Sequence, residues 1–518
     1  MTPLVTPLVT PVPGVVAVVL VAVATLAIGT WGLRFSRTTS DFFVASRSVR
    51  PALNASAIGG EYLSAASFLG VAGLVLAFGA DMLWYPVGWT AGYLVLLALV
   101  AAPLRRSGAY TLPDFAEARL GSTAVRAASS MLVVAIGWLY LLPQFQGAGL
   151  TLRAALGAPT WVGSVVVASV VLVNVFSGGM RSITFVQAFQ YWLKLTALLV
   201  PAVVLLMVWV GDGAPNPADA GGPSSAQASA AVWSLPLGSG GSEGLYLTYS
   251  LIVATFLGTM GLPHVVVRFY TNPDGRAARR TTLVVLALLG LFYLLPPVYG
   301  ALGRVYGDPS HSDTLVLDLP RTMVGGYGGE LLTALVTAGA FAAFLSTSSG
   351  LSIAISGVIG QDVIGRFTPS GVAAFRLAAV VAIVVPCALS VAVPNVGIAQ
   401  VVGLAFAVAA STFAPLLLLG IWWRGLTSAG AMSGLLVGFA GSGTGVGYAL
   451  ANATPAGWGG VLLGQPAAWT VPLAFGVMVG VSRLTADSVP PHAQRFMVRL
   501  HTPEALTLDR GPDRTPLG

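Results

Sequence analysis

The sequence predicts an all-α polytopic membrane protein with about 13 transmembrane helices. Two observations lead to this prediction. First, 56% of the 518 residues are hydrophobic and only 8% are charged, whereas about a quarter of the residues of a soluble domain are charged. Second, the apolar residues form long runs, and a helix of roughly 20 apolar residues spans a bilayer. The runs lie near residues 14–36, 52–79, 83–104, 124–151, 160–177, 183–211, 244–271, 281–303, 329–359, 371–393, 397–423, 427–452 and 463–483.

The first run, 14–36, is expected to be a retained transmembrane helix. No basic residue precedes it, and four arginines follow it between residues 34 and 50. A cleavable secretory signal has the reverse order, with its basic residues before the apolar run.

Arginine placement predicts the orientation, because basic loops stay on the cytoplasmic side of a membrane. An exterior N-terminus puts most loop arginines inside and leaves only Arg153, Arg304 and Arg321 outside. The long loops near 212–243 and 304–328 are then exterior. We therefore expect a multi-pass plasma (inner) membrane protein with a cytoplasmic, partly disordered tail at 484–518.

Two predicted spans are interrupted in their middle by glycine or proline, at Gly59-Gly60 and between Gly258 and His264. Such a pair of broken spans at matching positions is typical of transporters built from inverted repeats. The prediction is a single transmembrane domain, 1–483. Its expected parts are the first helix at 14–36, repeat one at 52–211, repeat two at 244–423 and the last two helices at 427–483.

The first broken span carries Gly60, Glu61, Leu63, Ser64 and Ser67 at the expected depth of the bilayer centre. Unwound backbone at this depth exposes carbonyl oxygens that suit Na⁺ and amide groups that suit an anion. Small residues alone are equally typical of helix packing. The buried carboxylate of Glu61 favours a functional role, since a charge inside a membrane is costly.

A second polar run, Ser346 to Ser349, lies within the predicted span 329–359. A single hydroxyl in a helix usually bonds back to its own backbone carbonyls. Four adjacent hydroxyl residues exceed that need, and oxygen ligands are what a hard cation requires. The run therefore favours cation coordination.

The second broken span supplies Leu262, Pro263 and His264. Proline removes one backbone hydrogen bond and so frees a carbonyl. His264 is a candidate for solute binding, with a structural role equally compatible with the sequence.

Lys194 is the only lysine in the chain and lies about ten residues inside the predicted span 183–211, too deep for its side chain to reach the interface easily. Glu61 and Lys194 are a candidate intramembrane charge pair. Pairing of Lys194 with backbone carbonyls and attraction of an anionic solute are the alternatives.

The sequence contains neither a Walker loop nor a His/Cys metal cluster, so an enzyme or an ATP-driven pump is not expected. The net charge of +7 comes from arginines in short loops, which topology explains better than nucleic-acid binding. The expected partners are the lipid bilayer, a small anionic solute and Na⁺, with no organic cofactor and no obligate protein partner.

Short motifs run in a fixed order from about residue 40 to residue 365. They are Asp41–Ala45, Glu61–Gly70, Tyr110–Ala116, Tyr140–Gln144, Gly147–Gly149, Gly178–Met180, Gly261–His264, Arg268–Phe269, Ser346–Thr347 and Asp362. This ordered set resembles the sodium:solute symporter family, and most closely its cation/acetate (monocarboxylate) permease branch.

The resemblance implies a LeuT-type 5+5 inverted-repeat core with one extra N-terminal and two extra C-terminal helices, and transport driven by a Na⁺ gradient. It also implies a cation site made of backbone carbonyls at the first break and of a carbonyl and two hydroxyls in the span 329–359. On this sequence the implied Na⁺ ligands are Gly60, Leu63, Ala343, Ser346 and Thr347.

Two positions depart from family members that carry sugars or proline. Gln187 stands where those members have Asp, and Leu262 stands where they have Gln or Asn. Both residues resemble the acetate-permease branch, which usually has an acidic residue at the position of Glu61 as well.

These observations predict a Na⁺-coupled symporter for a small monocarboxylate such as acetate, propionate or pyruvate. The expected solute-binding residues are Glu61, Ser64, Ser67, Leu262, Pro263 and His264. Three alternatives stay open at this point: a Na⁺-coupled proline or amino-acid symporter, proton coupling through Glu61, and a transporter-like sensor. The short tail, with no catalytic domain after it, disfavours the sensor.

Overall fold

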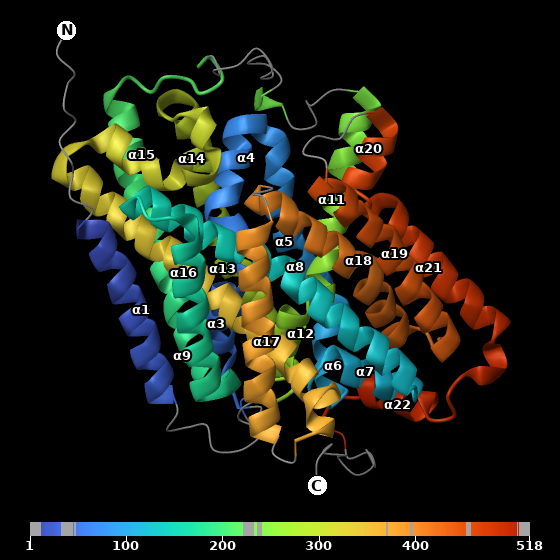
Figure 1. The fold of residues 1–518 in the computed structure, drawn as a ribbon. Helices are drawn as coiled ribbons and strands as arrows, with labels where there is room; N and C mark the ends of the chain where they lie inside the picture. The colour runs from blue at the N-terminus through green and yellow to red at the C-terminus, as the bar shows by residue number, and fades with distance from the viewer. Residues whose placement is uncertain are drawn as a thin grey trace.

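In the computed structural model, the part of the chain that the structure describes has only helices as its regular secondary structure (Figure 1). It comprises residues 12–32, 45, 48–220, 233–235, 241–368, 371–393, 397–451, 457–504 and 506. The motif at Asp41–Ala45 lies almost wholly outside these residues, as do most of the loop 212–243 and the end of the tail.

The helices of the N-terminal half are α1 (Val12–Gly32), α3 (Pro51–Tyr62), α4 (Val71–Phe78), α5 (Trp84–Val95), α6 (Ala101–Arg106), α7 (Leu112–Leu120), α8 (Thr123–Leu156) and α9 (Thr160–Gly211). Those of the C-terminal half are α11 (Gly241–Gly261), α12 (Pro263–Phe269), α13 (Gly275–Tyr293), α14 (Leu295–Tyr306), α15 (Leu315–Val324), α16 (Gly326–Asp362), α17 (Gly371–Ala392), α18 (Ile398–Trp422), α19 (Ser428–Ala451), α20 (Gly457–Gly464), α21 (Ala467–Leu484) and α22 (Ala493–His501).

The predicted membrane spans all fall on these helices. Among the described residues, 11 helical stretches are long and apolar enough to cross a membrane. One of them, Ala66–Arg106, contains the end of the second predicted span and the whole of the third. The predicted spans 160–177 and 183–211 together form α9, which is kinked at Gly179 because the backbone there is not helical (φ 55°, ψ −159°).

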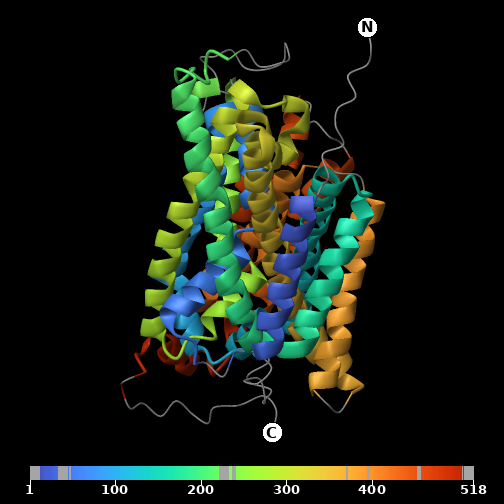
Figure 2. The same cartoon turned by 90° about the vertical axis from the view of Figure 1, so that its left-hand side faces the viewer.

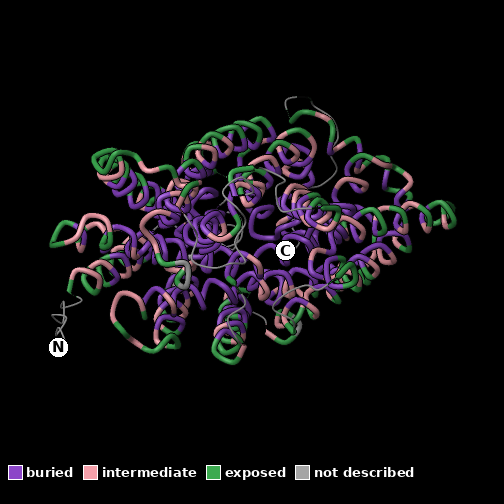
Figure 3. The backbone as a smooth tube through the Cα atoms, turned by 90° about the horizontal axis from the view of Figure 1, so that it is seen from above, coloured by how far each residue is buried: buried purple, intermediate pink, exposed green. Residues whose placement is uncertain are grey.

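Most of the long helices run side by side in roughly the same direction and form one bundle (Figures 1 and 2). Buried residues lie at the centre of the cross-section and exposed residues lie mainly at its rim (Figure 3). The helices α16 and α18 are the most deeply buried of the spans, whereas α1 is largely exposed. Exposed apolar residues on the rim fit contact with lipid, because a bilayer accepts the apolar surface that water would disfavour.

The first broken span is interrupted at a different place from the one predicted. Gly59 and Gly60 lie within α3, and the helix ends after Tyr62. The chain passes Leu63 and Ser64 before a π-helical turn, η3 (Ala66–Gly70), leads into α4. The glycines serve close packing instead, since a Cβ on Gly60 would lie 2.1 Å from the backbone oxygen of Gln187 in α9.

The second broken span is interrupted within the predicted stretch. Helix α11 ends at Gly261, and α12 begins at Pro263. Leu262 between them has an extended backbone (φ −74°, ψ 120°). Proline at the first position of α12 costs no helical hydrogen bond, because the first amide groups of a helix have no partner within it.

The ends of several helices that the sequence assigns to the cytoplasm are joined by hydrogen bonds. Arg105 at the end of α6 donates to the backbone of Asn272 and to that of Pro273 (2.6 Å). Arg119 of α7 donates to the carbonyls of Gly420 and Trp423 at the end of α18, each at 3.0 Å. Burial lowers the pKa of Arg119 to about 10.

The structure describes the predicted tail as far as residue 504. It contains α22, whose Arg499 donates to the backbone oxygen of Arg106 at 3.1 Å. Glu504 pairs with the Arg106 guanidinium at 3.4 Å. Met497 and Leu500 of α22 are buried, so packing of its apolar face explains why this polar segment folds.

We predict that Gly60→Ala destabilises the protein, because the added methyl group meets backbone that cannot rotate away. Overpacking of this kind typically costs about 1–3 kcal/mol. Gly443→Ala in α19 is the matched control, since a Cβ there has open space. Thermal stability of the purified variants, followed by size-exclusion chromatography, measures the effect. Equal stability of the two variants would show that α3 and α9 can separate without cost.

Candidate functional site

The site begins at the break after α3, where two backbone carbonyls meet the buried side chain of Lys194 from α9. The Lys194 amine donates to the carbonyls of Gly60 and Leu63, the latter at 2.7 Å. It also donates to the hydroxyl of Ser346 in α16 at 2.5 Å. All four residues are completely or almost completely buried. The carbonyls left without helical partners by the break are thus satisfied from two other helices.

The hydroxyl residues of α16 complete this cluster. Ser346 Oγ lies 2.6 Å from the Gly60 carbonyl and 3.1 Å from the Ala343 carbonyl, and it can donate to either. Thr347 Oγ1 donates to the carbonyl of Glu61 at 2.6 Å. The structure therefore brings together the five residues to which the resemblance assigns Na⁺, with Thr347 bonded to the neighbouring carbonyl.

Glu61 forms a buried ion pair with Arg268 of α12, at 2.6 Å between Oε2 and Nε. Both side chains are at most 2% exposed. The direct partner of the Glu61 carboxylate is therefore Arg268, and a charge pair between Glu61 and Lys194 stays a prediction. Removal of one partner from a buried pair of this kind typically costs about 3–5 kcal/mol.

Gln187 of α9 connects the two clusters. Its Oε1 accepts from the Arg268 guanidinium, and its Nε2 donates to the backbone oxygen of Ser346 at 2.8 Å. Arg268 also donates to Thr184 Oγ1 at 2.9 Å. Because Thr184, Gln187, Tyr191 and Lys194 recur every three or four residues, one face of α9 supports both charges.

The predicted solute-binding residues lie at the two breaks, and several of their polar atoms are unpaired. Within the described residues, the Ser64 hydroxyl and both ring nitrogens of His264 are buried without a hydrogen-bond partner. Ser67 differs, since its hydroxyl bonds the hydroxyl of Tyr293 at 2.8 Å. Leu262 and Pro263 are buried and form the turn between α11 and α12.

One stretch of α8 borders both breaks. Gln144 accepts a hydrogen bond from the Ala65 amide at 3.0 Å, just after the first break. Tyr140, one turn earlier, packs its ring against His264 with 5.2 Å between the ring centroids. Further buried donors without a partner, Trp89 Nε1 and Tyr93 OH, come from α5. The two breaks and the polar atoms between them therefore form one region of the protein.

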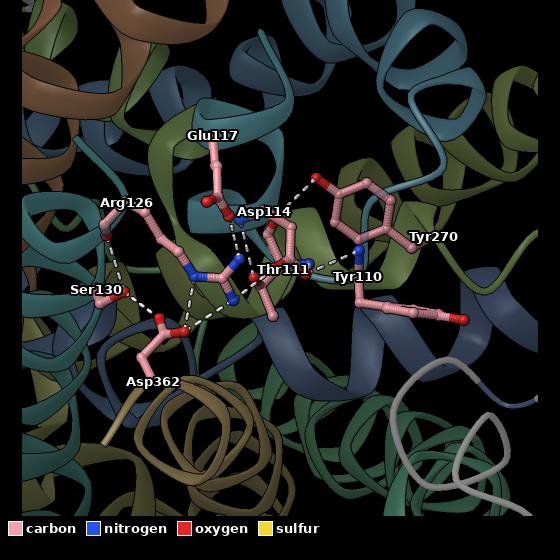
Figure 4. A network of polar contacts seen from close by, with 8 residues as sticks. All are labelled: Tyr110, Thr111, Asp114, Glu117, Arg126, Ser130, Tyr270 and Asp362. Carbon is pink, nitrogen blue, oxygen red and sulfur yellow. Dashed lines mark hydrogen bonds and ion pairs between the residues drawn. The ribbon is translucent and has the colours of Figure 1, made fainter. Parts of the chain in front are cut away.

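A separate polar network lies at the predicted cytoplasmic end (Figure 4). Arg126 at the start of α8 pairs with Asp114 (2.8 Å) and Glu117 (2.5 Å) of α7 and with Asp362 (2.7 Å) at the end of α16. Ser130 donates to the same Asp362 carboxylate. Burial raises the pKa of Asp114, and the Arg126 charge acts in the opposite direction.

Asp114 also fixes the start of α7. Its carboxylate accepts from the amide of Thr111 at 3.0 Å, and its own amide donates to the Thr111 hydroxyl at 3.2 Å. This reciprocal cap satisfies two amide groups that the helix cannot pair. The cap holds the carboxylate of Asp114 in place to receive Arg126.

Sequence reasoning misses two cations of these clusters. Arg268 falls within a recognised motif but is assigned no role there, although it lies only four residues after His264 and hence one turn along the same half-helix. Arg126 gives no signal of its own. Its three partners lie in two segments that are far apart in the sequence, α7 and the end of α16, and only Asp114 and Asp362 fall within recognised motifs.

Comparison with known proteins identifies relatives along most of the chain. Residues 42–438 match the model of the sodium:solute symporter family. The chain is 30% identical over 482 residues to the "uncharacterized symporter YwcA" of Bacillus subtilis (strain 168), covering 87% of this chain and 90% of the relative.

Two solved structures show the same fold at low sequence identity. A Na⁺-coupled sialic acid symporter in an outward-open state has a TM-score of 0.65 and 14% identity, covering 92% of this chain and 98% of that one. The nucleobase-cation-symport-1 family transporter MHP1 has a TM-score of 0.51 and 15% identity, with coverage of 89% and 99%.

These findings confirm an all-helical polytopic membrane protein with leucine-transporter-like structural neighbours, and a transporter rather than an enzyme. They identify neither the transported solute nor a branch of the family. The matched region covers most of the chain, and the relative aligns over nearly its whole length. The protein therefore belongs to the sodium:solute symporter family, whose members are Na⁺-coupled solute symporters.

Proposed function

We propose that this protein is a secondary symporter that takes up a small monocarboxylate, such as acetate, propionate or pyruvate, by alternating access. The observation that carries this proposal is the group of unpaired polar atoms between the two breaks. Ser64 and His264 present buried polar atoms that no described residue satisfies. Buried polar groups normally have partners, so a transported solute is a reasonable partner for these atoms.

The chemistry of the region suits a carboxylate. Hydroxyl, imidazole and indole groups can each donate a hydrogen bond, and carboxylate oxygens accept them. Trp89 and Tyr93 supply the indole and phenol donors near the first break. Arg268 offsets the negative charge of Glu61, which would otherwise repel an anion.

The aromatic surroundings favour a small solute. Tyr62, Trp89 and Tyr140 all pack against the ring of Phe406, with centroid separations between 5.7 and 6.2 Å. These rings fill the space around the breaks, so that an acid of a few carbon atoms fits more easily than a sugar. Proline is the alternative solute, and the family implies Na⁺ as the coupling cation, with a proton as the alternative.

The Arg126 network supports alternating access by holding the predicted cytoplasmic end closed. It ties α16, which contributes to the cation cluster, to α7 and α8. Opening on this side requires Asp362 and Arg126 to separate. Transport itself needs no covalent chemistry, because a bound solute shifts the equilibrium towards the conformation that binds it better.

We predict that proteoliposomes containing the protein take up labelled acetate or pyruvate, and that unlabelled acetate competes for this uptake whereas proline does not. Parallel assays with a Na⁺ gradient and with a proton gradient identify the driving ion. Empty liposomes control for passive entry of the protonated acids. Uptake of proline that acetate leaves unchanged would contradict the proposed solute class.

We predict that His264→Ala raises the solute concentration needed for half-maximal uptake by about tenfold or more. A hydrogen bond to a charged group contributes about 1.5–3 kcal/mol, and about 1.4 kcal/mol changes affinity tenfold. His492→Ala, near the end of the chain and remote from the breaks, is the control. An unchanged half-saturation concentration at equal protein level would remove His264 from the solute site.

We predict that Arg126→Ala weakens closure of the cytoplasmic end, because it leaves three carboxylates without their shared cation. A reporter cysteine at Ile355, which is buried near the end of α16 and packs on α8, is introduced after Cys387→Ala. Alkylation by an impermeant maleimide in inside-out vesicles should become faster in Arg126→Ala than in the Arg495→Ala control. Equal rates would show that the network does not control access.

A further inference from the structure

The environment of Lys194 is that of a cation held by oxygen ligands. Its amine donates to two carbonyls, which can only accept, and to the Ser346 hydroxyl. An ammonium group has three N–H donors and no acceptor. The three contacts therefore use every donor of a charged lysine, and the side chain is completely buried.

Within the described residues, Glu61 makes no direct ion pair with Lys194. The carboxylate is paired with Arg268 at 2.6 Å. Carbonyl groups at the C-terminal end of a helix carry partial negative charge. The end of α3, with the free carbonyls of Gly60 and Leu63, therefore supplies the attraction that holds the ammonium.

The same oxygens are the ones to which the family resemblance assigns Na⁺. Gly60, Leu63 and Ser346 account for three of the five expected ligands, and all three contact Lys194. Thr347, a fourth, donates its proton to the Glu61 carbonyl. These oxygens cannot enclose a Na⁺ ion while the amine lies among them.

Close packing of α3 on α9 makes this arrangement possible. A Cβ on Gly60 would lie 2.1 Å from the Gln187 oxygen, and a Cβ on Gly59 would lie 2.8 Å from the Tyr191 ring. Only glycine allows the two backbones to approach so closely. The short separation lets the lysine side chain, two turns after Gln187, reach the carbonyls.

We propose that the Lys194 ammonium is a built-in monovalent cation that fills the cation site at the break after α3 and excludes Na⁺ from it. This inference rests on the proposed symport function but not on the identity of the solute. It means that the site differs from that of relatives that hold Na⁺ between the same oxygens. Removal of the amine should leave a set of oxygen ligands that can accept Na⁺.

Binding of radioactive Na⁺ to the purified full-length protein, without any solute, tests the proposal. Wild type should bind Na⁺ at the background level. Lys194→Ala should bind Na⁺ saturably, at a level about tenfold or more above that of wild type. A tenfold change in affinity corresponds to about 1.4 kcal/mol of binding free energy. Lys194→Arg, which keeps a cation, should stay near background. Gln190→Ala, on the same helix but bonded to Thr25, is the matched control.

The double variant Lys194→Ala/Ser346→Ala locates the gained binding. It should lose most of the Na⁺ bound by Lys194→Ala, because Ser346 contributes one of the ligands. If Lys194→Ala does not fold, wild type alone still decides the matter. Saturable Na⁺ binding by wild type that disappears in Ser346→Ala would overturn the proposal.

The measurement also separates this inference from the proposed function. If wild type binds Na⁺ only at background, Lys194→Ala gains binding and no monocarboxylate is transported, the role of Lys194 stays intact and the solute class is refuted. A protein that transports acetate while its wild-type site binds Na⁺ through Ser346 would do the opposite.

Discussion

The site depends on the need to satisfy the backbone where the helix after Pro51 stops inside the membrane. A buried carbonyl without a partner costs free energy comparable to a lost hydrogen bond, and lipid offers no water to replace it. Lys194, Ser346 and Thr347 bond the carbonyls of Gly60, Leu63 and Glu61. Since these side chains come from α9 and α16, the break fixes how both helices sit against α3.

The buried charges are arranged so that each has a defined partner. Glu61 and Arg268 join the two broken spans directly, and Gln187 links this pair to the carbonyl cluster of Ser346. Short polar contacts therefore connect the two breaks. The Arg126 cluster is distinct, because it joins the ends of α8 and α16 to α7. The Glu61–Arg268 pair thus lies at the candidate site, and the Arg126 cluster joins helices at one end of the bundle.

Sequence alone predicted the spans well, because a bilayer requires long apolar helices and their hydropathy is a local property. The exact break and the charge partners were harder. Gly59 and Gly60 resemble helix breakers but serve the close approach of α9, which only the fold reveals. Glu61 and Arg268 are separated by 207 positions. The depth of Lys194 in its span indicated that the ammonium group needs a polar partner but did not select one. Backbone carbonyls were therefore only one of the alternatives.

Lys194 is the only lysine in the chain, and all the other Lys and Arg residues are arginines. The chemistry of the lysine side chain explains why it, and not an arginine, lies at the break. Arginine presents several donors in a planar fork, and Arg268 uses them on three partners: Nε on Glu61, Nη1 on Thr184 and Nη2 on Gln187. Lysine presents a compact charge with three donors that diverge from one atom. Two backbone carbonyls and one hydroxyl converge on the single nitrogen atom of Lys194. The geometry of the broken helix therefore selects the ammonium group, and this same geometry is suited to a small monovalent cation.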